Sequence, residues 1–185
     1  MQRITAIKHE ESTGKAKELL DAVKAKLGFV PNLMATMASS PAVLEAYLNF
    51  NGALGTSLNA KLREQIALTV AEINGCGYCA SAHSAIGKMV GLDNHSIEDA
   101  RRASSHDAKV DAALKFASAL VISRGKASEA EIEAVKAAGY TEKEVSEIVA
   151  NVALNIFTNY FNETATTVID FPAIEFPLVS KSAHA

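Results

Sequence analysis

The segment that decides the fold spans residues 64–83 and reads EQIALTVAEINGCGYCASAH. Apolar residues recur at helical spacing through its first half, which predicts a helix over residues 61–73. The pair Asn74-Gly75 interrupts this pattern, because both residues favour turns. A second helix is predicted over residues 77–90. The segment therefore predicts two consecutive helices joined by a short break, with two cysteines at the start of the second.

The rest of the 185-residue chain has a helical pattern as well. Apolar residues make up 49% and charged residues 21%, a balance typical of a folded globular protein. None of the 4 prolines falls between residues 42 and 171, and alanine, the best helix former, recurs throughout. Helices are predicted over 15–27, 32–38, 42–55, 61–73, 77–90, 96–103, 109–124, from the capping residue Ser128 to Gly139, and from Thr141 to about Phe161. The sequence thus predicts an all-α fold in a single domain over residues 1–185.

The last of these helices has the most regular apolar pattern. Spacings of i, i+3, i+4 and i+7 join Val145, Ile148, Val149, Val152, Ala153, Ile156, Phe157, Tyr160 and Phe161. We interpret this stripe as the face that enters the core. Beyond it, two Phe-Pro pairs predict an extended C-terminal arm over residues 170–185, because residues before proline avoid the helical region. The apolar residues of the arm should pack on their own domain or on a neighbouring subunit.

Charge and hydropathy exclude several classes of protein. The formal net charge is −3 and no basic stripe is present, so binding to nucleic acid is not expected. No apolar run approaches the ~18 residues that span a bilayer, and the first residues lack a signal-peptide pattern. The 2 cysteines cannot build the disulfide framework of a small secreted domain. We therefore expect a cytoplasmic protein that binds no membrane.

The two cysteines form a C-x-x-C motif with a histidine one turn later. Cys76, Cys79 and His83 are spaced by three and four residues, so their side chains share one face of a helix. A thiol becomes a reactive thiolate beside an imidazolium or at a helix N-terminus. Two cysteines at this spacing can also close a disulfide. Glu64, on the preceding helix, reaches His83 if the two helices form a hairpin, and would then orient the ring or accept its proton.

The two cysteines differ in what surrounds them. Cys76 lies nearest the helix start, where the dipole stabilises an anion by ~0.3–1 kcal/mol at an exposed terminus. Cys79 has His83 one turn further along the helix. A charged imidazole in contact outweighs a partly solvated dipole, so we expect Cys79 to be the nucleophile.

The motif is also compatible with roles that are not catalytic. The cysteines could be inert buried thiols, since free cysteine is often buried. They could hold zinc, with His83 and Glu64 as the remaining ligands, because a structural zinc site needs four. Covalent haem attachment is excluded, because it needs histidine directly after the second cysteine, where this chain has Ala80.

Other polar residues give weaker signals. The remaining histidines are isolated in the sequence and are interpreted as surface residues without a role: His9, His95, His106 and His184. Tyr78, between the cysteines, is interpreted as a packing residue, because tyrosine is mainly an apolar body. Glu72 belongs either to a solvated face or to the thiol site as a second carboxylate.

The spacing of Glu64, eleven intervening residues, Cys76-x-x-Cys79 and then x-x-x-His83 resembles the signature of AhpD-type alkylhydroperoxidases, within the carboxymuconolactone decarboxylase superfamily. Softer matches flank this signature on both sides, in 28–33, 40–41, 58–91, 138–141 and 155–162. The resemblance implies an all-α fold built around a helix hairpin that carries the motif. It also implies assembly into trimers or hexamers.

The same resemblance assigns a role to each site residue. Cys79 would be the peroxidatic thiolate, Cys76 the resolving partner, and His83 with Glu64 the proton relay. The substrates would be a hydroperoxide and an external dithiol or reductase protein, with no metal or organic cofactor. Some members have histidine directly before the second cysteine, where this chain has Tyr78. Decarboxylase members lack the cysteine pair, which argues against lactone decarboxylation.

Two other functions remain open at this point. The same cysteine pair could serve a protein disulfide reductase or a redox sensor, whose substrate is the disulfide of another protein. The chain could also be a non-enzymatic helical oligomer with a structural or metal-bound thiol pair.

Overall fold

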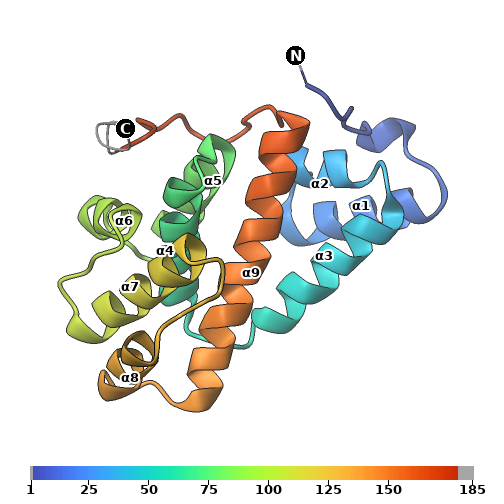
Figure 1. Ribbon diagram of the computed structural model, residues 1–185. Helices are drawn as coiled ribbons and strands as arrows, with labels where there is room; N and C mark the ends of the chain where they lie inside the picture. Colours follow the sequence, from blue (N-terminus) through green and yellow to red (C-terminus); the bar gives the residue numbers. More distant parts are fainter. Residues whose placement is uncertain (1, 179–185) are drawn as a thin grey trace.

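The computed structural model describes residues 2–178, and within this range the chain forms nine α-helices, one short 3-10 helix and no strand (Figure 1). The helices are α1 (Gly14–Leu27), α2 (Asn32–Met37), α3 (Pro41–Leu54), α4 (Ala60–Ile73), α5 (Gly77–Met89), α6 (Asn94–Arg101), α7 (Ala108–Ile122), α8 (Glu129–Ala137) and α9 (Glu142–Ala165), preceded by the 3-10 helix η1 (His9–Glu11). The all-α prediction is confirmed. The predicted helix boundaries agree within two residues, except that α9 continues beyond Phe161 to Ala165.

Local capping chemistry explains these boundaries. Ser128 with Glu131 and Thr141 with Glu144 form two capping boxes, in which each side chain bonds the backbone of the other residue. The Asn59 side chain caps α4 by accepting a hydrogen bond from the Leu62 N–H at 2.9 Å. Helix ends are therefore encoded locally, which is why they could be predicted.

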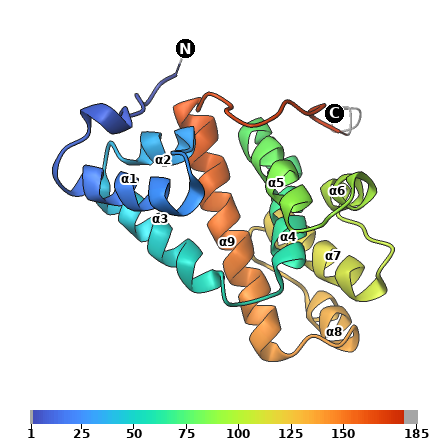
Figure 2. The ribbon, with the colours of Figure 1, turned by 180° about the vertical axis from the view of Figure 1, so that it is seen from behind.

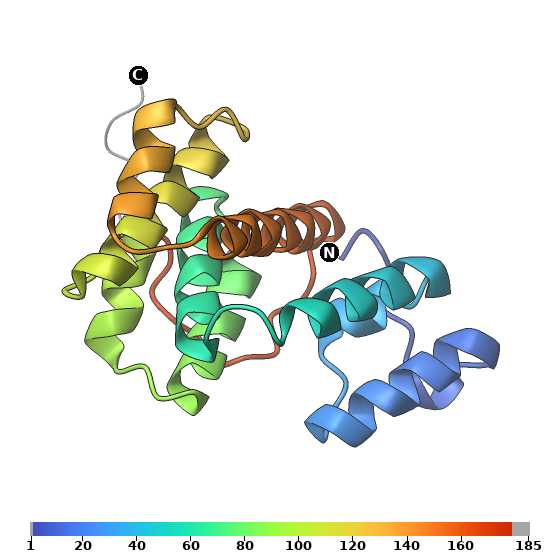
Figure 3. The same ribbon diagram turned by 90° about the horizontal axis from the view of Figure 1, so that it is seen from below.

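Helix α9 runs between two groups of helices, with α1–α3 on one side and α4–α8 on the other (Figures 1 and 2). The view from below shows the same arrangement, with α9 over the gap between the two groups (Figure 3). Helix α4 packs against α5, α6, α7 and α9. One apolar cluster joins α4 to α6–α9, and a second joins α1–α3 to the start of α5. The two cysteines belong to the second cluster.

The predicted core stripe of α9 is only partly correct. Ile148 and Val152 are buried, but Val149, Phe157 and Tyr160 are exposed by 43%, 39% and 62% of their surfaces. The buried face of the helix instead carries four asparagines, Asn151, Asn155, Asn159 and Asn162. The helix is rotated relative to the prediction, because a polar face of α9 is turned toward the interior.

The C-terminal arm crosses the start of α5 on its own chain. The Phe171 ring packs edge-on against Tyr78 with centroids 5.7 Å apart, and the Phe176 ring lies against Gly77. Residues 170–178 of the predicted arm contain no helix or strand, and residues 179–185 lie outside the described residues. The single-domain organisation stays a prediction.

A buried ion pair holds residues 175–178 of this arm. Arg101 Nε donates to Glu72 Oε2 at 2.8 Å, and both side chains are less than a tenth exposed. Glu72 Oε1 accepts a hydrogen bond from the Leu178 N–H at 2.6 Å, and Arg101 donates to the Glu175 carbonyl at 2.8 Å. Both interpretations of Glu72 were therefore wrong, since it neither faces solvent nor joins the thiol site.

Within residues 2–178, no helix combines the length and the apolar character that crossing a bilayer requires.

Candidate active site

The turn between α4 and α5 places the cysteine pair at the start of a helix. Gly75 adopts a left-handed φ of 72°, which glycine allows without steric cost. The Cys76 N–H then donates to the Ala71 carbonyl at 2.9 Å, which closes the end of α4. Cys76 is the N-cap of α5, and its sulfur accepts a hydrogen bond from the Cys79 N–H at 3.4 Å. Helices α4 and α5 pack against each other, so residues distant from the turn come back together.

The two sulfurs lie in direct contact and are both reduced. The Cys76 thiol donates to Cys79 Sγ at 2.8 Å. Cys76 is fully buried, whereas Cys79 is 2% exposed. Closure of a disulfide, with its S–S bond of about 2.05 Å, would need only a small movement of the two side chains.

Glu64 and His83 meet across the α4–α5 pair. His83 Nδ1 lies 2.8 Å from Glu64 Oε2, and both side chains are partly buried. Burial lowers the pKa of His83, but the adjacent Glu64 carboxylate outweighs this effect and holds the pKa above the ordinary histidine value. Within the described residues no hydrogen bond joins His83 to either sulfur, although its charge acts on Cys79 through space.

The two thiols have opposite pKa shifts. Burial raises the pKa of Cys79, but the hydrogen bond from Cys76, the charge of His83 and the amide of Asn162 outweigh burial and bring the pKa to about 7. The pKa of Cys76 is well above its ordinary value, because its proton is held by Cys79 and the side chain is buried. These shifts favour the thiolate on Cys79 over Cys76, and the hydrogen bond from Cys76 contributes more to this than the charge of His83, on which the prediction rested. The assignment of Cys79 as the nucleophile stays a prediction.

Two asparagines of α9 complete the surroundings of the thiolate, and the sequence analysis missed both. Asn162 Nδ2 donates to Cys79 Sγ at 3.2 Å. Asn159 Oδ1 accepts from Asn74 Nδ2 at 2.9 Å, while its own Nδ2 is buried without a hydrogen-bond partner in the described range. The Asn159 amide also lowers the pKa of Cys79. The available signal was the spacing of asparagines along α9 by four, four and three residues, which places them on one face.

A cavity of about 550 Å³ opens onto Cys79. Its walls are mostly apolar, and its polar groups include Glu64, His83 and the Tyr47 hydroxyl. Cys79 lines this cavity, whereas Cys76 does not. The pKa of Tyr47 is raised by its burial and by the nearby Cys79 and Glu64 charges, which keeps its hydroxyl a proton donor. Tyr47 was also missed by the sequence analysis, since it lies far from the motif and has no motif of its own.

The Tyr78 hydroxyl bonds to the backbone of α2 and, within the described residues, forms no hydrogen bond with either sulfur. It accepts a hydrogen bond from the Leu33 N–H at 3.1 Å, and the Tyr78 ring packs against Phe171. The packing role predicted for this residue is therefore correct, with a hydrogen bond to α2 in addition.

The four candidate ligands for zinc do not form a preassembled site. Among the described residues, no three of the donor atoms of Cys76, Cys79, His83 and Glu64 lie within 4.8 Å of one another. The motif instead presents a cysteine pair beside a histidine–carboxylate pair.

Residues 41–121 match the profile of the carboxymuconolactone decarboxylase family. The fold matches a solved structure from Ralstonia eutropha JMP134, described as an alkylhydroperoxidase AhpD core and peroxidase-related protein. That match has a TM-score of 0.80 and 22% identity, and covers 91% of this chain and 92% of the other. Residues 41–121 are therefore similar to the carboxymuconolactone decarboxylase family, and the chain has the fold of the AhpD core.

Other solved structures of this AhpD-like fold carry different descriptions. A peroxidase-related protein from Silicibacter sp. TM1040 matches with a TM-score of 0.78 and 24% identity over 90% of this chain and 92% of that one. The debrominase Bmp8, as a C82A variant in complex with 2,3,4-tribromopyrrole, matches with a TM-score of 0.78 and 22% identity over 92% of each chain. A comparison with curated proteins gave no match. Among these proteins of the same fold, Bmp8 is named as a debrominase, and the other two are named as uncharacterized peroxidase-related proteins.

Proposed function

We propose that this protein is a thiol-dependent peroxidase that reduces hydroperoxides at Cys79. The observation that carries the proposal is the position of one sulfur: Cys79 lines the cavity with a pKa of about 7, and its partner thiol lies 2.8 Å behind it. The lowered pKa favours the thiolate form of Cys79. The cavity offers a bound molecule no other cysteine, because Cys76 is fully buried.

In the oxidative step, the Cys79 thiolate attacks the terminal oxygen of a hydroperoxide R–OOH. The O–O bond breaks, Cys79 becomes a sulfenic acid and the remaining RO⁻ leaves as an alcohol after it gains a proton. His83 supplies that proton, because Glu64 raises its pKa and favours the protonated ring. Tyr47 is a second donor on the cavity wall.

In the resolving step, Cys76 attacks the Cys79 sulfur and water leaves, which closes the disulfide. The contact between the sulfurs favours this reaction, and the high pKa of Cys76 keeps it protonated until the sulfenic acid has formed. An external dithiol then reduces the disulfide by two exchange reactions, the first at Cys79. No metal or organic cofactor takes part.

The direct test compares peroxide consumption by wild type, Cys79→Ser and Cys76→Ser with a dithiol as reductant. Cys79→Ser should lose turnover completely. Cys76→Ser should retain one rapid oxidation per chain, visible as a sulfenic acid trapped by dimedone, but should lose turnover. Equal rates in wild type and Cys79→Ser would contradict the proposal.

A protein disulfide reductase or redox sensor is disfavoured by the burial of the motif. With exposures of 0% and 2%, neither sulfur is accessible to the disulfide of a folded protein. If the reductase function were correct, a protein disulfide would be reduced faster than cumene hydroperoxide by the same enzyme. The structural-oligomer alternative predicts thiols that react with neither substrate.

A second candidate reaction is reductive debromination, favoured by the mostly apolar cavity over the thiolate and by the likeness of fold to Bmp8. The balance is simple: Ar–Br gains a proton and two electrons and releases bromide, while Cys76 and Cys79 lose two electrons and form a disulfide. Bromide release from 2,3,4-tribromopyrrole with a dithiol present, absent in Cys79→Ser, would support this candidate over the peroxidase.

We also propose that the chain assembles into a homo-oligomer, a trimer or hexamer as the family resemblance implies. The exposed apolar face of α9, which carries Val149, Phe157 and Tyr160, supports this proposal. Light scattering should give a mass that is a multiple of 19.6 kDa, and a monomer at micromolar concentration would contradict it.

A further inference from the structure

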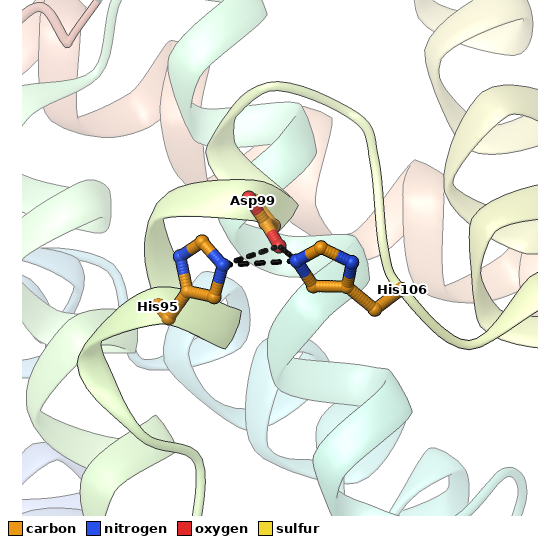
Figure 4. Close-up of side chains that lie close together, drawn as sticks. All are labelled: His95, Asp99 and His106. Carbon is orange, nitrogen blue, oxygen red and sulfur yellow. Dashed lines mark hydrogen bonds and ion pairs between the residues drawn. The ribbon is translucent and has the colours of Figure 1, made fainter.

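A second cluster of ligand-type side chains lies on the surface, outside the cysteine cavity. His95 and Asp99 project from α6, and His106 comes from the loop before α7 (Figure 4). The two histidines face each other with their Nε2 atoms 2.9 Å apart. Asp99 Oδ2 lies 3.8 Å from His95 Nε2 and 3.5 Å from His106 Nε2. The interpretation of these histidines as isolated was therefore wrong.

The backbone holds these three side chains in place. His95 and Asp99 are four residues apart on α6, which puts them on one face of the helix. The Asp99 carbonyl accepts hydrogen bonds from the Ser104 N–H at 3.0 Å and the Ser104 hydroxyl at 3.1 Å. The Ser105 N–H donates to Asp111 Oδ1 at 3.1 Å. The loop that carries His106 is thus fixed to both flanking helices.

The Asp99 carboxylate is available for a ligand. The neighbouring carboxylates are occupied, because Asp93 caps α6 by accepting from the Ser96 N–H and Asp107 caps α7 by accepting from the Lys109 N–H. In the described part of the chain, the side chain of Asp99 interacts with the two histidines and forms no other hydrogen bond or ion pair. It is mostly buried, with 16% of the side chain exposed, so it is desolvated next to two imidazoles.

The three separations fit the ligand atoms of one metal ion. A tetrahedral ion with ligands at about 2.0–2.1 Å separates any two ligand atoms by about 3.3 Å. The measured values of 2.9, 3.5 and 3.8 Å lie on both sides of this distance. Each side chain therefore needs a shift of a few tenths of an ångström, within the freedom of exposed histidines.

We propose that His95, Asp99 and His106 form a binding site for a divalent transition metal of the zinc type. Two imidazole nitrogens and one carboxylate oxygen are a ligand set that suits such ions, and water would occupy the fourth position on the solvent side. The bound ion would join α6 to the loop before α7. Because the ion binds the folded chain, it would stabilise the fold. The proposal does not depend on the peroxidase reaction.

The test is calorimetric titration of untagged, reduced protein with Zn²⁺ at pH 7.5, in wild type and in a Cys76→Ser/Cys79→Ser variant that removes competing thiols. Both proteins should bind one Zn²⁺ per chain at this site. Loss of an outer-shell partner typically weakens a metal site 10–100-fold. His95→Ala and His106→Ala, which remove direct ligands, should therefore weaken binding at least about tenfold.

The matched control is His9→Ala, because His9 pairs with the carboxylate of Asp21 at 2.7 Å but has no second histidine beside it. This variant should bind Zn²⁺ as wild type does. Added Zn²⁺ should raise the Tm of wild type by more than that of His106→Ala at the same concentration. Equal affinity in wild type and His106→Ala, loss of binding in the cysteine variant, or no binding by wild type would each overturn the proposal.

Discussion

The inner face of α9 is unusually polar for a buried face, although Ile148, Val152 and Leu154 are also buried there, and the outer face is unusually apolar. The inner face carries four buried asparagines, and the outer face carries Val149, Phe157 and Tyr160 in solvent. Asn162 and Tyr160 are two residues apart and so point roughly 160° away from each other. A helix selected only for packing in a monomer would have the reverse distribution.

The difference supports the proposal that the inner face serves the thiol site and that the outer face serves contact with another chain. Buried polar atoms without partners cost about 1–3 kcal/mol each, and both Asn159 Nδ2 and Asn162 Oδ1 are in this state within the described residues. The inner face carries these destabilising amides next to Cys79, where an amide N–H stabilises the thiolate form of the sulfur. The exposed apolar face is suited to contact with another chain.

Asn162→Leu on the inner face is expected to change the pKa and the alkylation rate of Cys79 more than the other substitutions below. Leucine keeps the approximate volume but removes the donor to Cys79 Sγ, a hydrogen bond to a charged group that contributes about 1.5–3 kcal/mol. The pKa of Cys79 should rise, and its alkylation by iodoacetamide at pH 7 should slow by about tenfold or more. At alkaline pH the rates of variant and wild type should converge. An unchanged rate at pH 7 would show that the asparagine face does not stabilise the thiolate.

A smaller change is expected from Asn159→Leu. Its amide lowers the pKa of Cys79 less than the amide of Asn162 does. The alkylation rate at pH 7 should fall severalfold, with the midpoint of the pH profile between those of wild type and Asn162→Leu. If the alkylation rate fell further in Asn159→Leu than in Asn162→Leu, Asn159 and not Asn162 would have the larger effect on the pKa of Cys79.

Glu64→Gln tests the histidine–carboxylate pair separately from the asparagines of α9. Since Glu64 raises the pKa of His83, the pair stabilises the fold fully below the ordinary histidine pKa of about 6.5. This stabilisation is lost as pH rises through the higher pKa of the folded state. Urea unfolding should therefore show a stability difference between wild type and variant that is larger near pH 6 than near pH 9. A difference independent of pH would argue against a charged His83–Glu64 pair.

The smallest effect on the site is expected from Tyr160→Ser on the outer face. Because the side chain is 62% exposed, the stability of an isolated chain should change by less than about 0.5 kcal/mol. The alkylation rate of Cys79 should match wild type, while the oligomer should dissociate at a higher protein concentration. If Tyr160→Ser altered the pKa of Cys79 as much as Asn162→Leu, the idea that only the inner face of α9 acts on the thiol would be wrong.

The fold and the motif could be predicted because both depend on local chemistry. Glycines, prolines and capping boxes such as Ser128 with Glu131 set the helix ends within each segment. The contact between Glu64 and His83 was expected on the condition that the helices carrying them form a hairpin, and α4 and α5 do pack against each other. The rotation of α9 could not be predicted, since its apolar residues cover so wide an arc that the pattern does not choose a face. The contact between His95 and His106 depends on the path of a loop that hydrogen bonds of Ser104 and Ser105 hold in place. The path of this loop could not be predicted from the sequence.

The full burial of Cys76 has a kinetic consequence. In the proposed peroxidase reaction, oxidant and reductant would enter through the same opening and react with the same atom, because Cys79 lines the cavity and Cys76 does not. The two substrates would then exclude each other, which gives a ping-pong rate law in which excess dithiol competes with peroxide for the reduced enzyme. The turnover rate would be highest at an intermediate ratio of dithiol to peroxide. It would depend on that ratio more than on the concentration of either substrate alone.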